Sequence, residues 1–448
     1  MLHKMPWLTN RRRLLILGFV DYLIIIILFI FLQLNQIINT NFLAINIFSL
    51  CWIISSYSLD KYSIVEDEYN LNLSNKFLRT TKIAITSGII FKLVIILFSF
   101  INSDVGDGKW PIYIFLVSVI SFFYETIHLF IIKKYIAKTL KWISIYSNKE
   151  SKSLFLKSSN LIEYGYFKSV HISKINELNK INSHDYGFIL EDINSLSNEE
   201  KKILINFKNE GYKILSLVSW LERYLHRYPS EFISSTNILN ELLTLKQSST
   251  SKRIKRFSEF CLTLILIIFV SPIILLASIL IKIEDKGPIL YSQKRNGFRG
   301  KAFTIYKLRS MQINAEREGI QWSTKNDKRI TKVGFWLRKT RVDELPQLFS
   351  VLKGEMSLIG PRPERPEIDE MLTQKVPNYK LRYLVRPGLS GWAQVNYPYG
   401  SSVEDTKMKF SYDIYYIKNL STFFDLLIFL ETIRLVFNFR GSQPKGSR

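Results

Sequence analysis

The adjacent carboxylates Asp343 and Glu344 are the residues of this chain whose types and setting best suit chemistry. They lie in the run Arg341-Val-Asp-Glu-Leu-Pro-Gln347. One carboxylate can attack phosphorus to form an aspartyl phosphate, and a second can bind a Mg²⁺ ion that neutralises a diphosphate. Neighbouring side chains of a helix point about 100° apart, so both can face one site with different tasks. At a helix start such a pair more often only complements the helix dipole, so the surrounding residues decide the interpretation.

Cations in two other segments favour a phosphate site around this pair. Lys307 and Arg309 are two residues apart, so on a strand they share a face and could clamp one phosphate group. An ordinary solvated strand edge is the alternative. In Gly360-Pro-Arg-Pro363 the two prolines restrict the backbone around Arg362, which suits an anion clamp, with a structural turn and a solvated Arg as the alternative. The glycine-rich turns of this part of the chain could also present backbone amides to phosphate.

Further candidates flank these segments. Arg295 lies beside a strand-like stretch, and Arg386 and Gln394 lie in the run Val385–Gln394. The same run contains Trp392, which could stack on a base or lie in a membrane interface. Asp413 is a candidate metal-binding or proton-handling carboxylate, and a buried helix cap is its alternative.

Two carboxylates, a metal ion and several Arg side chains are the minimum set for displacing one phosphate from a nucleotide diphosphate. We therefore predict a phosphoryl-transfer site in which one carboxylate of the pair attacks phosphorus and the other binds Mg²⁺. The predicted catalytic residues are Asp343, Glu344, Lys307 and Asp413, and the predicted substrate-binding residues are Arg295, Arg309, Arg362, Arg386 and Gln394.

Composition places this site in a membrane-associated chain of several units. The chain has 448 residues, 47% of them hydrophobic, which predicts membrane helices plus at least two soluble parts. A net charge of +23 indicates polyanionic partners, and the apolar runs favour lipid and phosphate, so we expect no nucleic-acid partner. Cys51 and Cys261 lie in apolar stretches, which excludes a disulfide framework and a thiolate metal site.

Four apolar stretches in residues 1–140 each have about the length needed to cross a bilayer as a helix. The basic run Arg11–Arg13 precedes the first stretch, which is too long for a cleaved signal peptide and lacks a small-residue cleavage site. Basic residues flank one side of the four stretches, so we predict a four-helix transmembrane region with both ends in the cytoplasm. The predicted spans are Leu14–Leu34, Phe42–Leu59, Ile83–Ile101 and Pro111–Ile132.

A fifth apolar stretch, Phe260–Ile283, has Ser271-Pro272 at its centre. Proline removes a backbone donor and clashes with the preceding turn, so a helix here must kink or break. Both flanks are basic, which favours a re-entrant helix over residues 258–283 that dips into one leaflet and returns. A fifth straight span with a mild kink is the alternative.

Residues 141–250 are predicted to form a small α/β domain. The expected strands are Tyr166–Ile172, Tyr186–Leu190 and Tyr212–Leu217, and the expected helix, Asn198–Glu210, has a capping box of Ser197 and Glu200 and stops at Gly211. A parallel, degenerate Rossmann-like sheet would follow. No Gly-x-Gly-x-x-Gly follows a strand, so the phosphate loop is missing and a structural or regulatory role is favoured over ligand binding.

The motifs from Lys252 to Arg440 together resemble the bacterial sugar transferase family, the monotopic polyprenyl-phosphate phosphoglycosyl transferases. The four predicted spans and the α/β domain further resemble its long members, which initiate capsule, exopolysaccharide or O-antigen repeat units. In chain order, the motifs are the basic start, the Ser271-Pro272 helix break, Gly287-Pro288, Gln293–Arg295, Tyr306–Met311, Asp343–Gln347, Lys353–Ser357, Gly360–Pro363, Arg386–Gly391 and Asp413–Tyr416.

The resemblance implies a two-step covalent mechanism. Asp343 would attack the sugar-bearing phosphate of a UDP-sugar and expel UMP, and undecaprenyl (polyprenyl) phosphate would then collect the phosphosugar. Lys307, Arg362, Arg386 and Asp413 fall at positions the family uses around its active site, and Glu344 would bind Mg²⁺. Two positions depart from the family pattern: Glu259, where Asp is usual after the basic start, and Leu308, where an aromatic residue is usual.

The expected fold is therefore an α-helical membrane region plus α/β, with an α-rich mixed catalytic domain at residues 251–440 and a disordered tail at residues 441–448. The expected protein is a polyprenyl-phosphate hexose-1-phosphate transferase of the bacterial inner membrane, facing the cytoplasm, with a possible homodimer. An inactive scaffold or nucleotide sensor, and direct attack by the lipid phosphate without a covalent intermediate, are the alternatives. The motifs do not specify the sugar; glucose and galactose are the first candidates.

Overall fold

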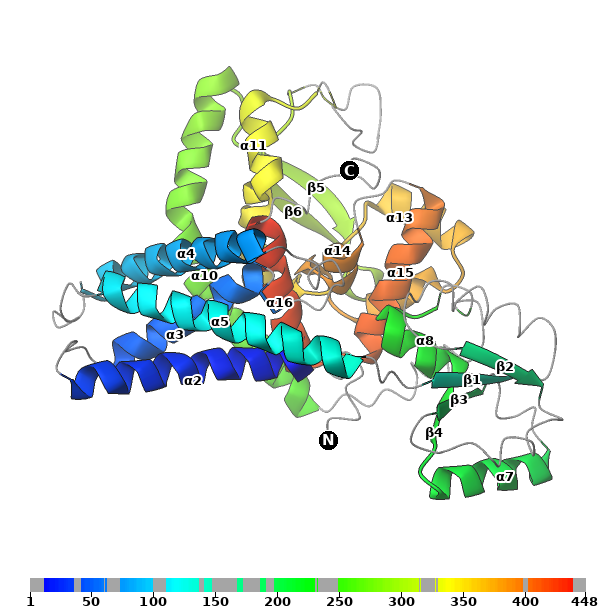
Figure 1. The fold of residues 1–448 in the computed structure, drawn as a ribbon. Coiled ribbons are helices and arrows are strands. Elements are labelled where there is room, and N and C mark those ends of the chain that lie inside the picture. The colour runs from blue at the N-terminus through cyan, green and yellow to red at the C-terminus, as the bar shows by residue number, and fades with distance from the viewer. Residues whose placement is uncertain are drawn as a thin grey trace. The chain divides into compact units, whose positions relative to one another are not determined.

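The computed structural model describes residues 12–35, 42–59, 61–62, 73–99, 110–136, 141–146, 167–171, 186–190, 197–229, 232, 249–313, 315, 327, 329–397 and 402–437. The chain forms two compact units, Met1–Thr139 and Leu140–Arg448. Figure 1 shows the elements of both, coloured along the chain. The boundary predicted between residues 250 and 251 stays a prediction, and the tail predicted at residues 441–448 lies outside the described residues.

Four helices make up the described part of the first unit. They are α2 (Arg12–Leu34), α3 (Phe42–Ser58), α4 (Leu73–Ser99) and α5 (Trp110–Ile136). Helix α2 packs on α3 and α5, and α4 packs on the same two helices.

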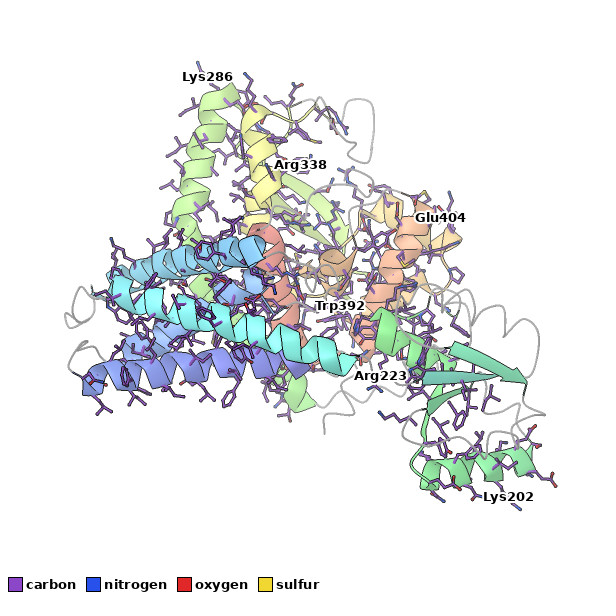
Figure 2. The ribbon with its side chains drawn as sticks, viewed as in Figure 1. Lys202, Arg223, Lys286, Arg338, Trp392 and Glu404 are labelled. Carbon is purple, nitrogen blue, oxygen red and sulfur yellow. The ribbon has the colours of Figure 1, made fainter. Side chains whose placement is uncertain are left out.

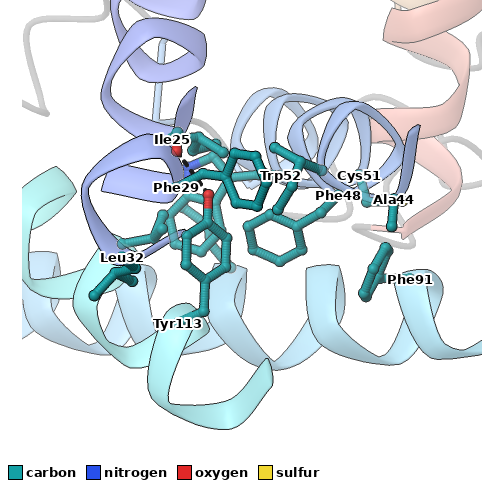
Figure 3. Packing of buried hydrophobic residues seen from close by; sticks show 12 residues of the cluster. Ile25, Phe29, Leu32, Ala44, Phe48, Cys51, Trp52, Phe91 and Tyr113 are labelled. Carbon is teal, nitrogen blue, oxygen red and sulfur yellow. Dashed lines mark hydrogen bonds between the residues drawn. The ribbon is translucent and has the colours of Figure 1, made fainter. Parts of the chain in front are cut away.

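The aromatic core of this bundle is centred on Phe48, whose ring centroid lies 5.4 Å from that of Phe91 and 5.3 Å from that of Tyr113 (Figure 3). The Tyr113 hydroxyl donates to the Ile25 carbonyl at 2.7 Å, which is the dashed line in Figure 3. The core therefore joins side chains from all four helices.

Length and composition qualify fewer of these helices as membrane spans than we predicted. Among the described residues, Ile16–Leu34, Trp110–Ile127 and Lys252–Asp285 are long and apolar enough to cross a membrane. Helix α3 is apolar but has only 17 residues, and α4 carries Lys76, Arg79, Lys82 and Lys92. The predicted helices are therefore present, but four spans are not confirmed.

A parallel sheet of four strands opens the second unit. The strands are β1 (Lys141–Tyr146), β2 (Phe167–His171), β3 (Tyr186–Leu190) and β4 (Lys213–Ser216), in the order β2-β1-β3-β4. The parallel sheet is confirmed, although β1 was missing from the prediction. Helix α7 (Asn198–Asn209) has the predicted capping box of Ser197 and Glu200, and Gly211 after it has φ +92°.

Residues on the two faces of this sheet pack against different helices. Phe188 packs with Phe207 of α7, whereas Trp142 and Ile189 pack with Trp220 of α8 (Leu217–Leu225), a helix we did not predict. Alternate residues of a strand point to opposite faces, so each helix covers one face. The resemblance to a Rossmann-like domain stays a prediction.

The remainder is the α-rich mixed region that was predicted. An antiparallel pair, β5 (Leu290–Asn296) and β6 (Ala302–Leu308), and a short parallel pair, β7 (Ser357–Ile359) and β8 (Gly388–Ser390), lie among helices. The helices are α10 (Ser249–Asp285), η5 (Phe298–Gly300), α11 (Lys332–Thr340), η6 (Val342–Gln347), α12 (Leu348–Lys353), α13 (Pro366–Lys375), η7 (Tyr379–Leu384), α14 (Trp392–Asn396), α15 (Val403–Lys418) and α16 (Thr422–Phe437).

Helix α10 is continuous through Ser271 and Pro272, so the predicted break is not an interruption of the helix. Its N-terminal part is fixed by Arg256, which donates to the Val351 carbonyl at 2.7 Å, and by Glu259, which accepts from the Ser357 hydroxyl at 3.1 Å. Its C-terminal part buries Ala277 and Ile281 against β6 and α11. The N-terminal part of α10 therefore contacts α12 and β7, and its C-terminal part packs on β6 and α11.

Candidate active site

A cavity of about 530 Å³ lies in the second unit and collects most of the predicted site residues. Among the described residues, ten basic and four acidic side chains line it, an excess of positive charge that suits a diphosphate. Its lining includes the predicted residues Arg295, Lys307, Arg309, Asp343, Glu344, Arg362, Gln394 and Asp413. Residues more than 100 positions apart are thus brought together around one hollow.

The carboxylate pair is positioned by a turn between two helices. Helix α11 ends at Arg341, whose backbone is left-handed with φ 58°, and η6 begins at the next residue. Asp343 and Glu344 therefore fall in the first turn of η6, as the sequence indicated for a helix start. Each is only 8% exposed, so both carboxylates are largely removed from solvent.

Glu344 is saturated by cations. Its Oε1 accepts from Lys307 Nζ at 2.8 Å and from Arg362 Nη2 at 2.6 Å, and its Oε2 lies 3.5 Å from Arg341 Nη1. Burial alone would raise the pKa of Glu344, but these three cations outweigh burial and hold it well below its usual value. Glu344 is therefore an ionised anchor that gathers the cations of the site.

Asp343 has a different environment although it is the adjacent residue. Its carboxylate makes no hydrogen bond or ion pair with the residues that the structure describes. Burial, and next the negative charge of Glu344, raise the pKa of Asp343 to about 6. A buried, unbonded carboxylate on a cavity wall is free to act as a nucleophile above that pH.

Lys307 and Arg309 do not form one clamp in this structure. Lys307 pairs with Glu344, whereas Arg309 donates to Asp285 at the end of α10 and fills the space beside Gly287. Burial lowers the pKa of Lys307, which Glu344 partly offsets. Both side chains line the cavity, but they hold different carboxylates.

Asp413 lies on α15 and pairs with Arg382, whose Nη2 is 3.2 Å from its Oδ2. Burial raises the pKa of Asp413 to about 6, which Arg382 partly offsets. The same Arg382 atom donates to the Arg362 carbonyl at 2.6 Å. Arg382 thus links the Asp413 side of the cavity to the turn that carries Arg362.

The remaining predicted substrate ligands differ in their placement. Arg295 lines the cavity while donating to the Pro363 carbonyl at 3.2 Å, and Gln394 lines it while donating to the Leu389 carbonyl at 3.2 Å. Arg386 does not line the cavity; it donates to the Gly354 carbonyl at 3.1 Å. The structure therefore does not bring Arg386 to the other site residues.

The glycines of the two Pro-Gly motifs serve close backbone packing. Gly360 N donates to the Ser390 carbonyl at 2.8 Å, and Gly388 N donates to the Pro361 carbonyl at 2.9 Å. A Cβ on Gly388 would lie 2.0 Å from Gly360 N, so no larger residue fits there. These amides are engaged with carbonyls, and the expectation that such turns offer amides to phosphate does not hold for this pair.

Sequence reasoning missed six cations that line the cavity: Arg329, Arg338, Arg341, Arg365, Arg382 and Lys409. Arg338 is labelled on α11 in Figure 2, and Trp392 and Glu404 mark α14 and the first turn of α15. Lys409 precedes Asp413 by four residues on α15 and so shares its face, but no helix was predicted there, so the sequence alone did not connect the two residues.

The donor set fits Mg²⁺ only together with a substrate. The described residues contain no cluster of three His, Cys, Asp or Glu side chains able to hold a metal ion. Mg²⁺ is commonly held by one or two carboxylates plus substrate phosphates, and Glu344 with Asp343 provides such a pair. The cations on Glu344 must then shift toward the phosphates.

Comparison with known proteins agrees with this arrangement. Residues 250–439 match the family model described as bacterial sugar transferase. The chain is 44% identical over 204 residues to a UDP-N-acetylgalactosamine-undecaprenyl-phosphate N-acetylgalactosaminephosphotransferase of Aeromonas hydrophila, and 35% identical over 188 residues to a UDP-glucose:undecaprenyl-phosphate glucose-1-phosphate transferase of Escherichia coli strain K12. These segments cover 46% and 42% of this chain, and 48% and 40% of the two relatives, less than half of each.

A shorter relative is matched over most of its length. The chain is 50% identical over 129 residues to a putative undecaprenyl-phosphate N-acetylgalactosaminyl 1-phosphate transferase of Bacillus subtilis strain 168. That segment covers 29% of this chain and 72% of the relative. The family model and these relatives together show the family: the chain belongs to the bacterial sugar transferases.

Proposed function

We propose that the protein transfers a sugar 1-phosphate from a UDP-sugar to undecaprenyl phosphate and releases UMP. The observation that carries this proposal is the difference between two adjacent carboxylates. Asp343 makes no hydrogen bond with the described residues, whereas Glu344 contacts three cations. Relatives that bear undecaprenyl-phosphate sugar phosphotransferase names support the same reaction.

The chemistry follows from these two environments. In the first step a carboxylate oxygen of Asp343 bonds to the sugar-bearing phosphorus while the bond from that phosphorus to the UMP oxygen breaks, and UMP departs with the electron pair. In the second step an oxygen of the lipid phosphate attacks the same phosphorus, and the bond to Asp343 breaks. Each step leaves the phosphorus with the same number of bonds and restores the free carboxylate at the end.

Lys307, Arg341 and Arg362 stabilise the charge that the transferred phosphoryl group develops. All three contact Glu344 in the structure, so they are held at one place without substrate. Because Glu344 gathers these cations beside Asp343 before substrate binds, they need only shift from Glu344 to the phosphates to stabilise that charge. Mg²⁺, held by Glu344 and the substrate phosphates, would supply further charge neutralisation.

Contacts along α10 support a re-entrant helix over a fifth span. A straight helix of 37 residues would be about 55 Å long, against about 30 Å for a bilayer core, with its ends on opposite sides. Here Arg256 near one end contacts α12, and Ile281 near the other end packs against β6 and α11 of the same unit. Central residues such as Ile268 and Leu275 are 71% and 64% exposed. An apolar middle with both ends held by one domain suits insertion into a single leaflet.

The setting we propose is the bacterial inner membrane, with the catalytic region facing the cytoplasm, where UDP-sugars are made available. The basic residues beside the apolar helices support that orientation. The proposed role is to initiate an exopolysaccharide, capsule or O-antigen repeat unit. We also propose a homodimer, which the molecular mass of the purified protein in solution would test.

For the sugar, we propose N-acetylgalactosamine before glucose or galactose. The two relatives named for N-acetylgalactosamine share 44% and 50% identity with the chain over their matched segments, against 35% for the E. coli glucose relative.

The test is formation of lipid-linked sugar by purified protein in nanodiscs, given Mg²⁺, undecaprenyl phosphate and one UDP-sugar at a time. We expect UDP-N-acetylgalactosamine to yield UMP and a lipid diphosphate sugar at the highest kcat/KM. Product from another UDP-sugar alone would overturn the sugar assignment, and no product from any UDP-sugar with folded protein would favour an inactive scaffold.

A further inference from the structure

One end of the cavity is built by elements that the proposed chemistry has not yet used. Thr406, Lys409 and Asp413 of α15 all line it, and their spacing of three and four residues places them on one face of that helix. Gln394 and Tyr397 at α14 line the same cavity, and α14 packs on α15. This end carries a cation, Lys409, far along the chain from the carboxylate pair.

A chain of contacts connects this end to the carboxylate pair. Arg362 Nη2 donates to Glu344 at 2.6 Å, and the Arg362 carbonyl accepts from Arg382 at 2.6 Å. Arg382 in turn pairs with Asp413, which shares one face of α15 with Lys409. Arg362 therefore connects the cations around Glu344 with the end of the cavity that contains Lys409.

Two cationic ends joined by an Arg match a substrate with two linked phosphates. In phosphoryl transfer the attacking and leaving oxygens lie roughly in line on opposite sides of the phosphorus. If Asp343 attacks the sugar-bearing phosphate beside Lys307 and Arg362, the departing phosphate must lie away from Asp343. The α14–α15 end of the lining contains Lys409, a cation suited to that departing phosphate.

A second feature indicates a polar ligand at this end. The Gln394 side-chain oxygen is buried and has no hydrogen-bond partner among the described residues, although its nitrogen donates to the Leu389 carbonyl. A buried acceptor without a donor is costly, and a ligand N–H, such as that of a pyrimidine base, would satisfy it. Tyr397 is held beside it by a 2.7 Å hydrogen bond from its hydroxyl to Asp405.

On the basis of the proposed function, we propose that Lys409 binds the uridine-bearing phosphate of the UDP-sugar, the phosphate that leaves as UMP. Lys409 is thus a nucleotide-binding residue, whereas Lys307 and Arg362 serve the phosphate that is transferred. In the second step the Asp343 oxygen is the leaving group, so the lipid phosphate must attack from the side that UMP has left.

The experiment measures equilibrium binding of UMP and of uridine to the full chain in nanodiscs, by calorimetry, for wild type and three variants. Lys409→Met removes the cation, Lys409→Arg keeps it, and Lys407→Met removes an exposed lysine two residues earlier on the same helix. We expect Lys409→Met to weaken UMP binding roughly 10-fold or more, with uridine binding unchanged. The Lys407→Met and Lys409→Arg variants should bind UMP nearly as the wild type does.

Kinetics then test the same assignment during turnover. Lys409→Met should raise KM for the UDP-sugar, and Lys407→Met should leave it unchanged. Unchanged UMP affinity in a folded Lys409→Met protein, or an unchanged KM for the UDP-sugar, would overturn the inference while the transferase proposal stands. UMP binding that depends on Lys409, in a wild-type protein that transfers no sugar, would overturn the transferase proposal and leave the role of Lys409 in nucleotide binding.

Discussion

The helical bundle and the cavity each contain a buried carboxylate, but the two carboxylates differ in their hydrogen bonds. In the bundle, Asp21 of α2 is 1% exposed and accepts from Lys61 at 2.5 Å, from the Tyr62 hydroxyl at 2.5 Å and from the Ser121 hydroxyl at 3.2 Å. At the cavity, Asp343 is 8% exposed and accepts no hydrogen bond from the described residues.

The difference separates a structural carboxylate from a reactive one. Burial of a carboxylate is costly, and the bonds to Asp21 offset that cost by tying the segment after α3 to α2 and α5. For Asp343 the free-energy cost of burial is not offset by such bonds, because Lys307 and Arg362 pair with Glu344 instead. An uncompensated carboxylate next to a fully compensated one is the arrangement expected where a nucleophile must stay available.

The largest effect should come from removing the reactive carboxylate. Asp343→Asn should lower the rate of UMP release by at least about 10³-fold, because an amide cannot form the aspartyl phosphate. Its melting temperature at pH 8 should be unchanged or higher, since a buried charge without hydrogen bonds is removed. Initial rates with UDP-sugar and thermal unfolding provide the two readouts, and a marked loss of stability would contradict the free state of Asp343.

The bundle cluster should respond in the opposite sense. Lys61→Met leaves Asp21 buried without its cation and should destabilise the first unit by about 3 kcal/mol. The double variant Asp21→Asn/Lys61→Met should recover part of that loss. Thermal unfolding in nanodiscs measures both, and the residual activity of folded protein should stay close to that of wild type. Equal stability of wild type and Lys61→Met would show that the cluster does not hold the bundle.

A smaller effect is expected for a cation that serves the transferred phosphate. Arg362→Met removes the shortest contact to Glu344, at 2.6 Å, and should lower kcat roughly 10²-fold with UMP still bound. Arg386→Met is the matched control, because Arg386 lies outside the cavity and donates to Gly354. A loss of kcat in Arg386→Met as large as in Arg362→Met would restore the substrate role that the sequence predicted for Arg386.

The pH dependence should report the pKa of Asp343, which burial raises to about 6. Only the ionised carboxylate attacks, so the rate of UMP release should fall as pH decreases through about 6. The folded state binds this proton more tightly than the unfolded chain, so the stabilising contribution present at low pH is lost as pH rises through about 6.

Asp413 provides the control for that profile, because its pKa is also raised to about 6. The inflection in the rate of UMP release should persist in Asp413→Asn if Asp343 is its source. An inflection that disappears in Asp413→Asn would assign the titration to the Asp413 and Arg382 pair instead.

Local sequence signals predicted most helices and strands, but features that depend on contacts between distant residues could not be predicted. The capping box of Ser197 and Glu200 is a contact within one turn, so α7 was predicted nearly to the residue. Strand β1 gains its neighbours β2 and β3 only from distant residues, and it was missed.

The same reasoning explains the site. Asp343, Glu344, Lys307 and Arg362 stood out because unusual residue types lie in short rigid motifs, and the cavity brings them together. Arg386 lies in an equally rigid motif but faces Gly354, since the motif's glycines are required for the packing of β7 on β8. Lys409 lies in an unremarkable helix, and only the cavity shows which of its faces matters.

The most direct test of the central claim is the amount of UMP released by purified protein given the UDP-sugar and Mg²⁺ without lipid. If Asp343 is the nucleophile, about one equivalent of UMP per enzyme should appear in a burst, the intact protein should gain the mass of one phosphosugar, and Asp343→Asn should show neither. UMP release that begins only when undecaprenyl phosphate is added, with no change in protein mass, would contradict the covalent role of Asp343.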